Sequence, residues 1–101
     1  MNKDIISLFR SRDKAITARN RDAFLSTQAG ELPNCSYEGY VSVGRLETKI
    51  LAVHSDQMNT IHKIAFVEER YYPKNKPSYS SFVLYFLIDT KEGWKIYRLS
   101  Y

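Results

Sequence analysis

The sequence predicts an α+β fold in which N-terminal helices pack on a curved antiparallel β-sheet. Two observations predict this class. Apolar residues recur at helical spacing over residues 4–19, and β-forming residues fill three long segments after residue 60. Helices followed by a run of hairpin-linked strands are typical of a layered α+β domain. The chain of 101 residues suits one domain, so we assign residues 1–101 to a single domain.

The first part of the chain is expected to form two helices. Residues 4–19 carry an apolar stripe with a period near 3.6 residues, and Asp4 complements the N-terminus of such a helix. Asn20 breaks this stripe and fits the N-cap of a second, shorter helix over residues 22–28. Gly30 then fits the end of that helix, because glycine tolerates the left-handed conformation that often follows the last turn.

The next two segments are less regular. Residues 36–43 are expected to form a short strand with a bend at Gly39. Residues 44–56 fit two structures, because one set of residues follows a helical spacing while another set alternates as in a strand. We favour a helix for this segment. The helical set is Val43, Leu46, Ile50 and Val53, and the alternating set is Thr48, Ile50, Ala52 and His54.

Three long antiparallel strands are expected in the second half of the chain, over residues 60–72, 79–89 and 94–101. The middle segment carries apolar side chains on both faces. Such a strand is covered on both sides, and a second subunit can cover the outer side. We therefore expect a homodimer that forms through the sheet. One face of the middle strand holds Phe82, Leu84, Phe86 and Ile88, and the other holds Val83, Tyr85 and Leu87.

Composition excludes several classes of protein. The single cysteine, Cys35, cannot form an internal disulfide, which disfavours a secreted, disulfide-stabilised fold. The first residues do not resemble a signal peptide, and no apolar run is long enough to span a bilayer. We therefore expect a cytoplasmic protein without a membrane span. The formal charge of +4 arises within residues 1–21, which hold six basic and two acidic groups. A solvated helix face is the usual reason for such a cluster.

Three segments resemble the nuclear-transport-factor-2-like superfamily, whose members are also called SnoaL-like or cystatin-like α+β cones. They are ITARNRDAFLST (residues 16–27), VGRLETKIL (43–51) and FVLYFLIDTKEGWKIYRLSY (82–101). The closing turn, with Gly93 and Trp94, is the part most similar to the superfamily. The resemblance implies a cone-shaped cavity between helices and sheet and frequent dimerisation through the sheet. It implies no reaction, because the superfamily includes isomerases, dehydratases, cyclases, hydrolases and non-enzymatic binding domains.

Candidate acid–base residues are few. Enzymes of this superfamily that move protons use an acid or a histidine in an apolar cavity, where burial shifts the pKa of that group. Glu68 and Glu69 are adjacent, so one of them faces inward on a regular strand, where it can lie beside Tyr85. The catalytic candidates are Glu68, His54 and Glu38. A surface glutamate paired with Arg70 is the competing interpretation of Glu68.

Aromatic residues supply the candidate ligand site. Tyrosine combines an apolar ring with a hydroxyl, and small-molecule cavities are mostly apolar with a few polar groups. The competing interpretation is that these rings only fill the core and a dimer interface. The candidate lining residues are Tyr37, Tyr40, Phe66, Tyr85, Phe86 and Trp94.

We therefore expect a non-catalytic domain that binds a small apolar ligand or another protein, with no cofactor and no metal. One alternative is a cofactor-independent isomerase, dehydratase or hydrolase acting on a small apolar substrate. A second alternative is a regulator that docks an acidic partner through the basic first helix, including Arg12 and Arg19. Nucleic-acid binding is disfavoured, because the basic groups and the aromatic residues lie on different elements.

Overall fold

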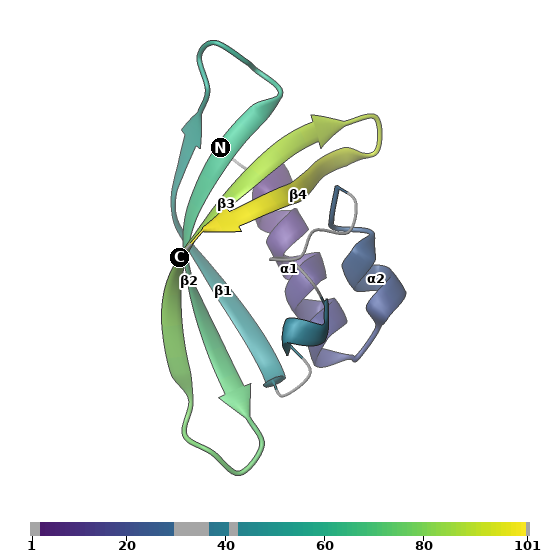
Figure 1. The fold of residues 1–101 in the computed structure, drawn as a ribbon, viewed down its shortest axis with the longest axis vertical. Helices are drawn as coiled ribbons and strands as arrows, with labels where there is room; N and C mark the ends of the chain where they lie inside the picture. Colours follow the sequence, from purple (N-terminus) through teal and green to yellow (C-terminus); the bar gives the residue numbers. More distant parts are fainter. Residues whose placement is uncertain (1–2, 30–36, 41–42, 101) are drawn as a thin grey trace.

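The computed structural model describes residues 3–29, 37–40 and 43–100. The helices lie together on one side of a strongly twisted sheet (Figure 1). The described strands form one antiparallel sheet in the order β1-β2-β3-β4, which curls around the first helix without closing into a barrel. The predicted α+β class is therefore confirmed. The elements are α1 Lys3–Thr17, α2 Arg21–Leu25, a 3-10 helix η2 Tyr37–Tyr40, β1 Val43–Ser55, β2 His62–Pro73, β3 Tyr79–Thr90 and β4 Gly93–Ser100.

Most predicted elements are confirmed, with shifts of a few residues at their ends. Asn20 caps α2 as predicted, since its side chain accepts a hydrogen bond from the Ala23 N–H at 3.0 Å. The three predicted strands of the second half correspond to β2, β3 and β4. Gly93 has a φ of +102° in the turn that joins β3 to β4, a conformation that glycine adopts without strain. The predicted helix end at Gly30 lies outside the described residues.

Two predictions from the middle of the chain are wrong. Residues 44–56 belong to β1 and not to a helix. Its register with β2 shifts at two places, between Val43 and Arg45 and between Ile50 and Ala52. Each irregularity adds a residue to the strand, so inward-facing residues stand three apart there and imitate a helical spacing. The strand predicted over residues 36–43 is instead η2 where the structure describes it, at Tyr37–Tyr40.

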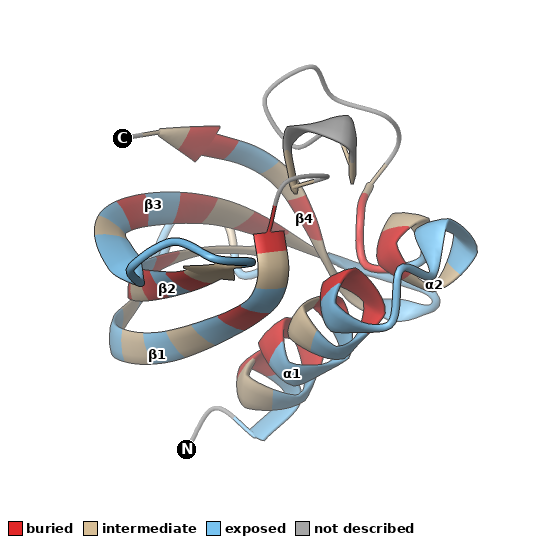
Figure 2. Cartoon of the chain, turned by 90° about the horizontal axis from the view of Figure 1, so that it is seen from below, coloured by how far each residue is buried: buried red, intermediate tan, exposed pale blue. Residues whose placement is uncertain are grey.

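The core lies between α1 and the concave face of the sheet. Figure 2 shows that buried residues follow the sheet-facing side of α1. Near its N-terminus, Ile5, Leu8 and Phe9 pack against β2, β3 and β4. Near its C-terminus, Ala15 and Ile16 join a second cluster formed with α2, β1 and β2. The partners in the two clusters are Ala65, Val67, Val83, Tyr85, Leu87, Ile96 and Leu99, and Phe24, Val43, Leu46 and Tyr71.

Candidate functional site

Arg12 is buried at the centre of the fold. It lies on the apolar stripe of α1, four residues after Leu8 and four before Ile16, and its side chain is only 1% exposed. Its Nη2 lies 2.5 Å from Glu69 Oε2 on β2 and donates a 2.7 Å hydrogen bond to Thr48 Oγ1 on β1. A buried charge needs such partners, because leaving water is costly. The interior polar cluster, as we call it, consists of Arg12, Asp13, Tyr40, Thr48, Glu69, Tyr71 and Tyr85.

Glu69 is the acceptor at the centre of this cluster. Its Oε1 accepts a 2.6 Å hydrogen bond from the Tyr71 hydroxyl, and its Oε2 accepts one of 2.5 Å from the Tyr85 hydroxyl. The Tyr40 hydroxyl lies 3.4 Å from Oε2 and 3.1 Å from the Tyr85 hydroxyl. Glu69 therefore has a cation and three tyrosine hydroxyls around its carboxylate.

These contacts fix the charge state of the pair. Burial alone raises the pKa of Glu69, but the Arg12 charge and the hydrogen bonds from Tyr71, Tyr85 and Arg12 outweigh it, so the pKa is lowered. Burial likewise lowers the pKa of Arg12, but Tyr85, Glu69 and its other acidic neighbours raise it well above the usual range. Burial raises the pKa of the Tyr85 hydroxyl. At neutral pH the ion pair is charged and Tyr85 is a neutral donor.

One side of the Arg12 guanidinium has no hydrogen-bond partner. Nη2 contacts Glu69, Thr48 and Asp13, the last at 3.2 Å. The other two nitrogens, Nε and Nη1, are buried without a hydrogen-bond partner in the described part of the chain. Aromatic rings surround the group instead, with centroids 4.8–5.8 Å from Cζ. Such rings attract a cation through their faces. They do not accept hydrogen bonds as an oxygen does, so two donor groups remain for another acceptor.

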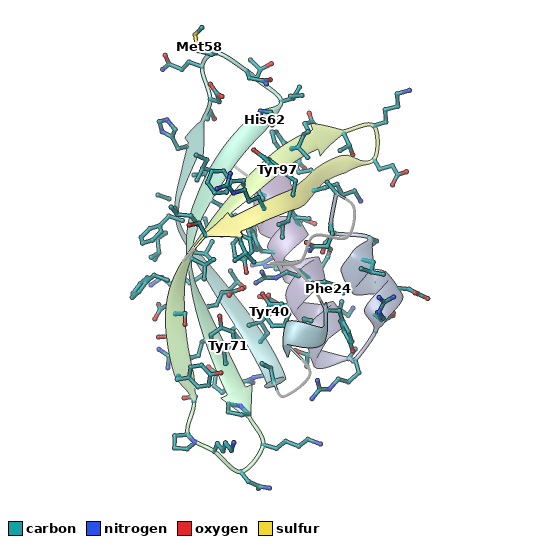
Figure 3. The ribbon with its side chains drawn as sticks, viewed as in Figure 1. Phe24, Tyr40, Met58, His62, Tyr71 and Tyr97 are labelled. Atoms are coloured by element: carbon teal, nitrogen blue, oxygen red, sulfur yellow. The ribbon has the colours of Figure 1, made fainter. Side chains whose placement is uncertain are left out.

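The predicted lining residues divide between two faces. Tyr40 and Tyr85 belong to the interior polar cluster, and the Tyr37 ring packs edge-on against Phe24 beside it, 5.6 Å between centroids. Figure 3 shows Tyr40 and Phe24 on the helix side of the sheet. Phe66 and Phe86 face the opposite side, because they alternate with the inward residues of β2 and β3. The structure therefore does not bring the six residues into one lining.

Trp94, the sixth predicted lining residue, occupies a third place. It lines a hollow of about 440 Å³ between the N-terminal part of α1 and the β3–β4 hairpin. Its ring packs against the core and lies 5.1 Å from the Lys63 Nζ. It is thus separate from the interior polar cluster and from the outer face.

The acid–base candidates are equally dispersed. Glu68 faces outward on β2, 3.9 Å from Arg70, and the acid beside Tyr85 is its neighbour Glu69. His54 is exposed near the end of β1. The side chain of Glu38 lies outside the described residues.

Sequence reasoning missed the central pair. The alternative of a docking regulator places Arg12 on an exposed face of the basic helix, but the burial of Arg12 removes it from any surface. The signal that could have found it is its place in the apolar stripe, where a charged residue requires a buried partner. The inward positions of Glu69 and Tyr71 follow from the two-residue alternation of β2, once Val67 is assigned to the interior.

The convex face of the sheet carries exposed apolar side chains. Phe82 is 58% exposed, Phe66 39% and Leu84 37%. The rings of Phe66 and Phe82 stack across β2 and β3, with centroids 5.9 Å apart and an angle of 21° between planes. We call these three residues the outer-face patch. Charged side chains of both signs border it on β1 and β2, namely Arg45, Glu47, Lys49, Glu68 and Arg70.

Two kinds of feature are absent from the described ranges. No group of three or more histidine, cysteine, aspartate or glutamate side chains there is arranged to hold a metal ion. Among the described helices, none has the length and apolar character needed to cross a membrane.

Similarity to known proteins lies in the fold and not in the sequence. No protein-family model matches the sequence, and no curated protein does. An NTF-2-like protein of unknown function from Shewanella oneidensis superposes with a TM-score of 0.71 at 12% identity, covering 92% of this chain and 91% of that one. A cystatin-like domain of unknown function from Nostoc punctiforme gives 0.71 at 18% identity, covering 98% and 76%. A SEC-C motif protein from Rhodopseudomonas palustris gives 0.66 at 13%, covering 93% and 75%. The resemblance seen in the sequence is thus confirmed for the fold.

Proposed function

We propose that this chain, which has the NTF2-like fold, is a non-catalytic interaction domain that pairs with a second copy of itself through the convex face of its sheet. The outer-face patch carries this proposal. Three large apolar side chains lie together on adjacent strands and are 37–58% exposed. Single exposed apolar residues are common, but a contiguous patch indicates an interaction surface. The predicted cytoplasmic location remains part of this proposal.

The charges around the patch favour a second copy as its partner. A twofold interface brings the same surface of both protomers together, so the surface must be complementary to itself. The apolar centre meets this requirement, because it packs against its own equivalent. The bordering side chains alternate in sign, with Glu47 between Arg45 and Lys49 on β1 and Glu68 near Arg70 on β2. A surface with both signs can pair with its own copy without net repulsion.

The interior polar cluster supports a non-catalytic function. A general base works best when its pKa is near the working pH, whereas the pKa of Glu69 is lowered by its partners. Its oxygens also accept from Arg12, Tyr71 and Tyr85, which leaves little capacity to take a proton from a substrate. Glu69 therefore does not supply the general base that the enzyme alternative requires.

Self-association is tested by sedimentation equilibrium on the wild type and two single variants. Phe82→Glu places a charge in the patch, and Ser80→Glu places the same charge on the same face of β3, outside the patch. We expect the wild type and Ser80→Glu to be dimers and Phe82→Glu to be a monomer with unchanged circular dichroism. A wild type that stays monomeric at high concentration, or a Phe82→Glu dimer, would contradict the proposal.

A second function, binding of a small ligand inside the fold, is favoured by two nitrogens of Arg12, Nε and Nη1, which have no hydrogen-bond partner in the described part of the chain. A ligand with a carboxylate or carbonyl oxygen on an apolar body would satisfy them, and the rings around Arg12 suit such a body. Tyr40 is only half-buried, and its hydroxyl lies 3.1 Å from that of Tyr85, so the ligand would enter beside it.

A thermal-shift screen of small carboxylic acids and ketones tests this second function. Hits should raise the Tm of the wild type, less so that of Tyr40→Phe, and equally that of Tyr37→Phe, a control on the same short helix. An unchanged Tm with every compound, or equal shifts in the two variants, would rule out binding beside Tyr40.

A further inference from the structure

A separate hollow lies on the convex face, at the end of the sheet formed by the β1–β2 hairpin. Its volume is about 660 Å³, which is within the range of small-molecule sites. Its walls come from all four strands of the described sheet, and Phe86 and Tyr97 supply its rings. The exposed hairpin residues, including Met58, form its rim. It does not include any member of the interior polar cluster or of the outer-face patch.

Aromatic rings form the floor of this hollow. Tyr97 lies 5.4 Å from the His62 ring and 6.2 Å from the Phe86 ring, between centroids, and all three are half-buried. Figure 3 shows His62 and Tyr97 close together. The register of β3 and β4 shifts opposite Tyr97, because Phe86 pairs with Arg98 while Leu87 pairs with Ile96. The extra residue in β4 leaves two successive residues, Tyr97 and Arg98, on the convex face beside Phe86, between Ile96 and Leu99 of the core.

His62 presents a defined donor to the hollow. The Asn59 Oδ1 accepts a 3.3 Å hydrogen bond from the Ile61 N–H, which orients the amide so that its Nδ2 faces His62 Nδ1 at 3.0 Å. Nδ1 is therefore the acceptor, and the neutral ring carries its proton on Nε2. A donor on a half-buried ring can bind an acceptor atom of a ligand.

The surrounding charges favour an anionic ligand. The Arg98 guanidinium lies 5.1 Å from the centre of the Phe86 ring, beside the hollow. The one carboxylate in the lining, Asp56, already accepts a hydrogen bond from the Met58 N–H within the hairpin. Lys63 also lines the hollow, and its amine is directed to the Trp94 ring.

We infer that this hollow is a binding site for a planar aromatic carboxylate. The ligand ring packs against Phe86 and Tyr97, and its carboxylate accepts from His62 Nε2 and lies near Arg98. This site is independent of the proposed self-association, because its contacts come from the hairpin end and not from the outer-face patch. Binding is therefore retained in monomeric Phe82→Glu.

The test uses 2-naphthoate as the probe and cyclohexanecarboxylate as an anion without a planar ring. Titrations are followed by amide chemical shifts of the ¹⁵N-labelled full chain. We expect saturable shifts at residues 54–64, 86 and 97 with 2-naphthoate, and much weaker binding of cyclohexanecarboxylate. The stacking of a planar ligand on one aromatic ring, together with the apolar area that it buries, should lower the Kd about tenfold relative to a ligand without such a ring.

Variants locate the site. Tyr97→Ser should raise the Kd for 2-naphthoate about tenfold, and His62→Gln should raise it while the spectrum stays folded. Tyr79→Ser removes an exposed tyrosine from the far end of the sheet and should leave the Kd unchanged. Shifts confined to the α1 side of the sheet, an unchanged Kd in both Tyr97→Ser and His62→Gln, or no saturable shift would overturn the inference. Retention of binding in Phe82→Glu separates this result from that of the dimer test.

Discussion

The two faces of β2 and β3 each combine polar and apolar side chains, but the concave face buries charges within its core and the convex face exposes large apolar side chains. On the concave face, Glu69 and Tyr85 form a charged and hydrogen-bonded cluster with Arg12, all of them 1% exposed. On the convex face, their neighbours Glu68 and Leu84 lie among exposed rings and surface charges. Adjacent residues of one strand therefore have opposite surroundings. We conclude that the concave face holds helix and sheet together, whereas the convex face leaves apolar side chains exposed.

The largest expected effect comes from breaking the interior ion pair. Arg12→Met leaves Glu69 buried without its cation, and such a loss typically costs about 3–5 kcal/mol of unfolding free energy. The double variant Arg12→Met/Glu69→Gln removes both charges and should recover part of this loss. Urea unfolding at one protein concentration measures both values. Equal stability of the single variant and the wild type would show that the pair contributes nothing.

The next effect concerns the convex face. Dimerisation makes the Tm depend on protein concentration, so the Tm of the wild type should rise as the protein is concentrated. Leu84→Glu introduces a charge into the patch and should abolish this dependence, since a central interface residue often contributes about 2 kcal/mol or more to association. Differential scanning calorimetry over a range of concentrations is the measurement. The same dependence in Leu84→Glu would locate the interface elsewhere.

A smaller effect compares two adjacent tyrosines. The Tyr71 hydroxyl donates to buried Glu69, whereas the Tyr72 hydroxyl donates to exposed Glu47. A hydrogen bond to a buried charge is worth about 1.5–3 kcal/mol, and a change at an exposed position is usually within about 0.5 kcal/mol. Tyr71→Phe should therefore destabilise the fold clearly and Tyr72→Phe hardly at all. Similar losses of unfolding free energy in both variants would remove the distinction between the two faces.

The smallest effect is the pH dependence of stability. The pKa of Glu69 is lowered from about 4.5 in the fold, so its contribution is complete above the unfolded-state pKa. That contribution is lost as the pH falls through the lower, folded-state pKa. Burial raises the pKa of Asp13 from its usual value, so protonation of Asp13 partly offsets this loss.

Unfolding free energies measured from pH 6 downward test this sign. The wild type should lose stability in acid, and Glu69→Gln should lose less over the same range. An identical acid dependence in the two proteins would show that other groups control it.

The sequence predicted α1, β2 and β3 because their apolar periods are undisturbed, and it predicted β4 because the turn at Gly93 joins this strand to β3. The pattern was misleading at β1. Two register shifts there put Val43 and Leu46, and then Ile50 and Val53, on the same face although the members of each pair are three residues apart. No local pattern distinguishes such a strand from a helix, since the pairing with β2 decides the outcome. Strict alternation along β3 could have separated Tyr85 from Phe86, which the sequence-based lining combined. The pairing of Arg12 with Glu69 could not be predicted, because the contact joins residues far apart in the chain.

The measurement that tests the account most directly is an isotope-filtered NOE experiment on a mixture of ¹³C-labelled and unlabelled protein. It detects only contacts between protomers. We predict intermolecular NOEs from the side chains of Phe66, Phe82 and Leu84, and none from Ile5 or Phe24 on the helix side. Intermolecular NOEs from the helices alone, or none at concentrations where a dimer is expected, would contradict the proposed role of the convex face.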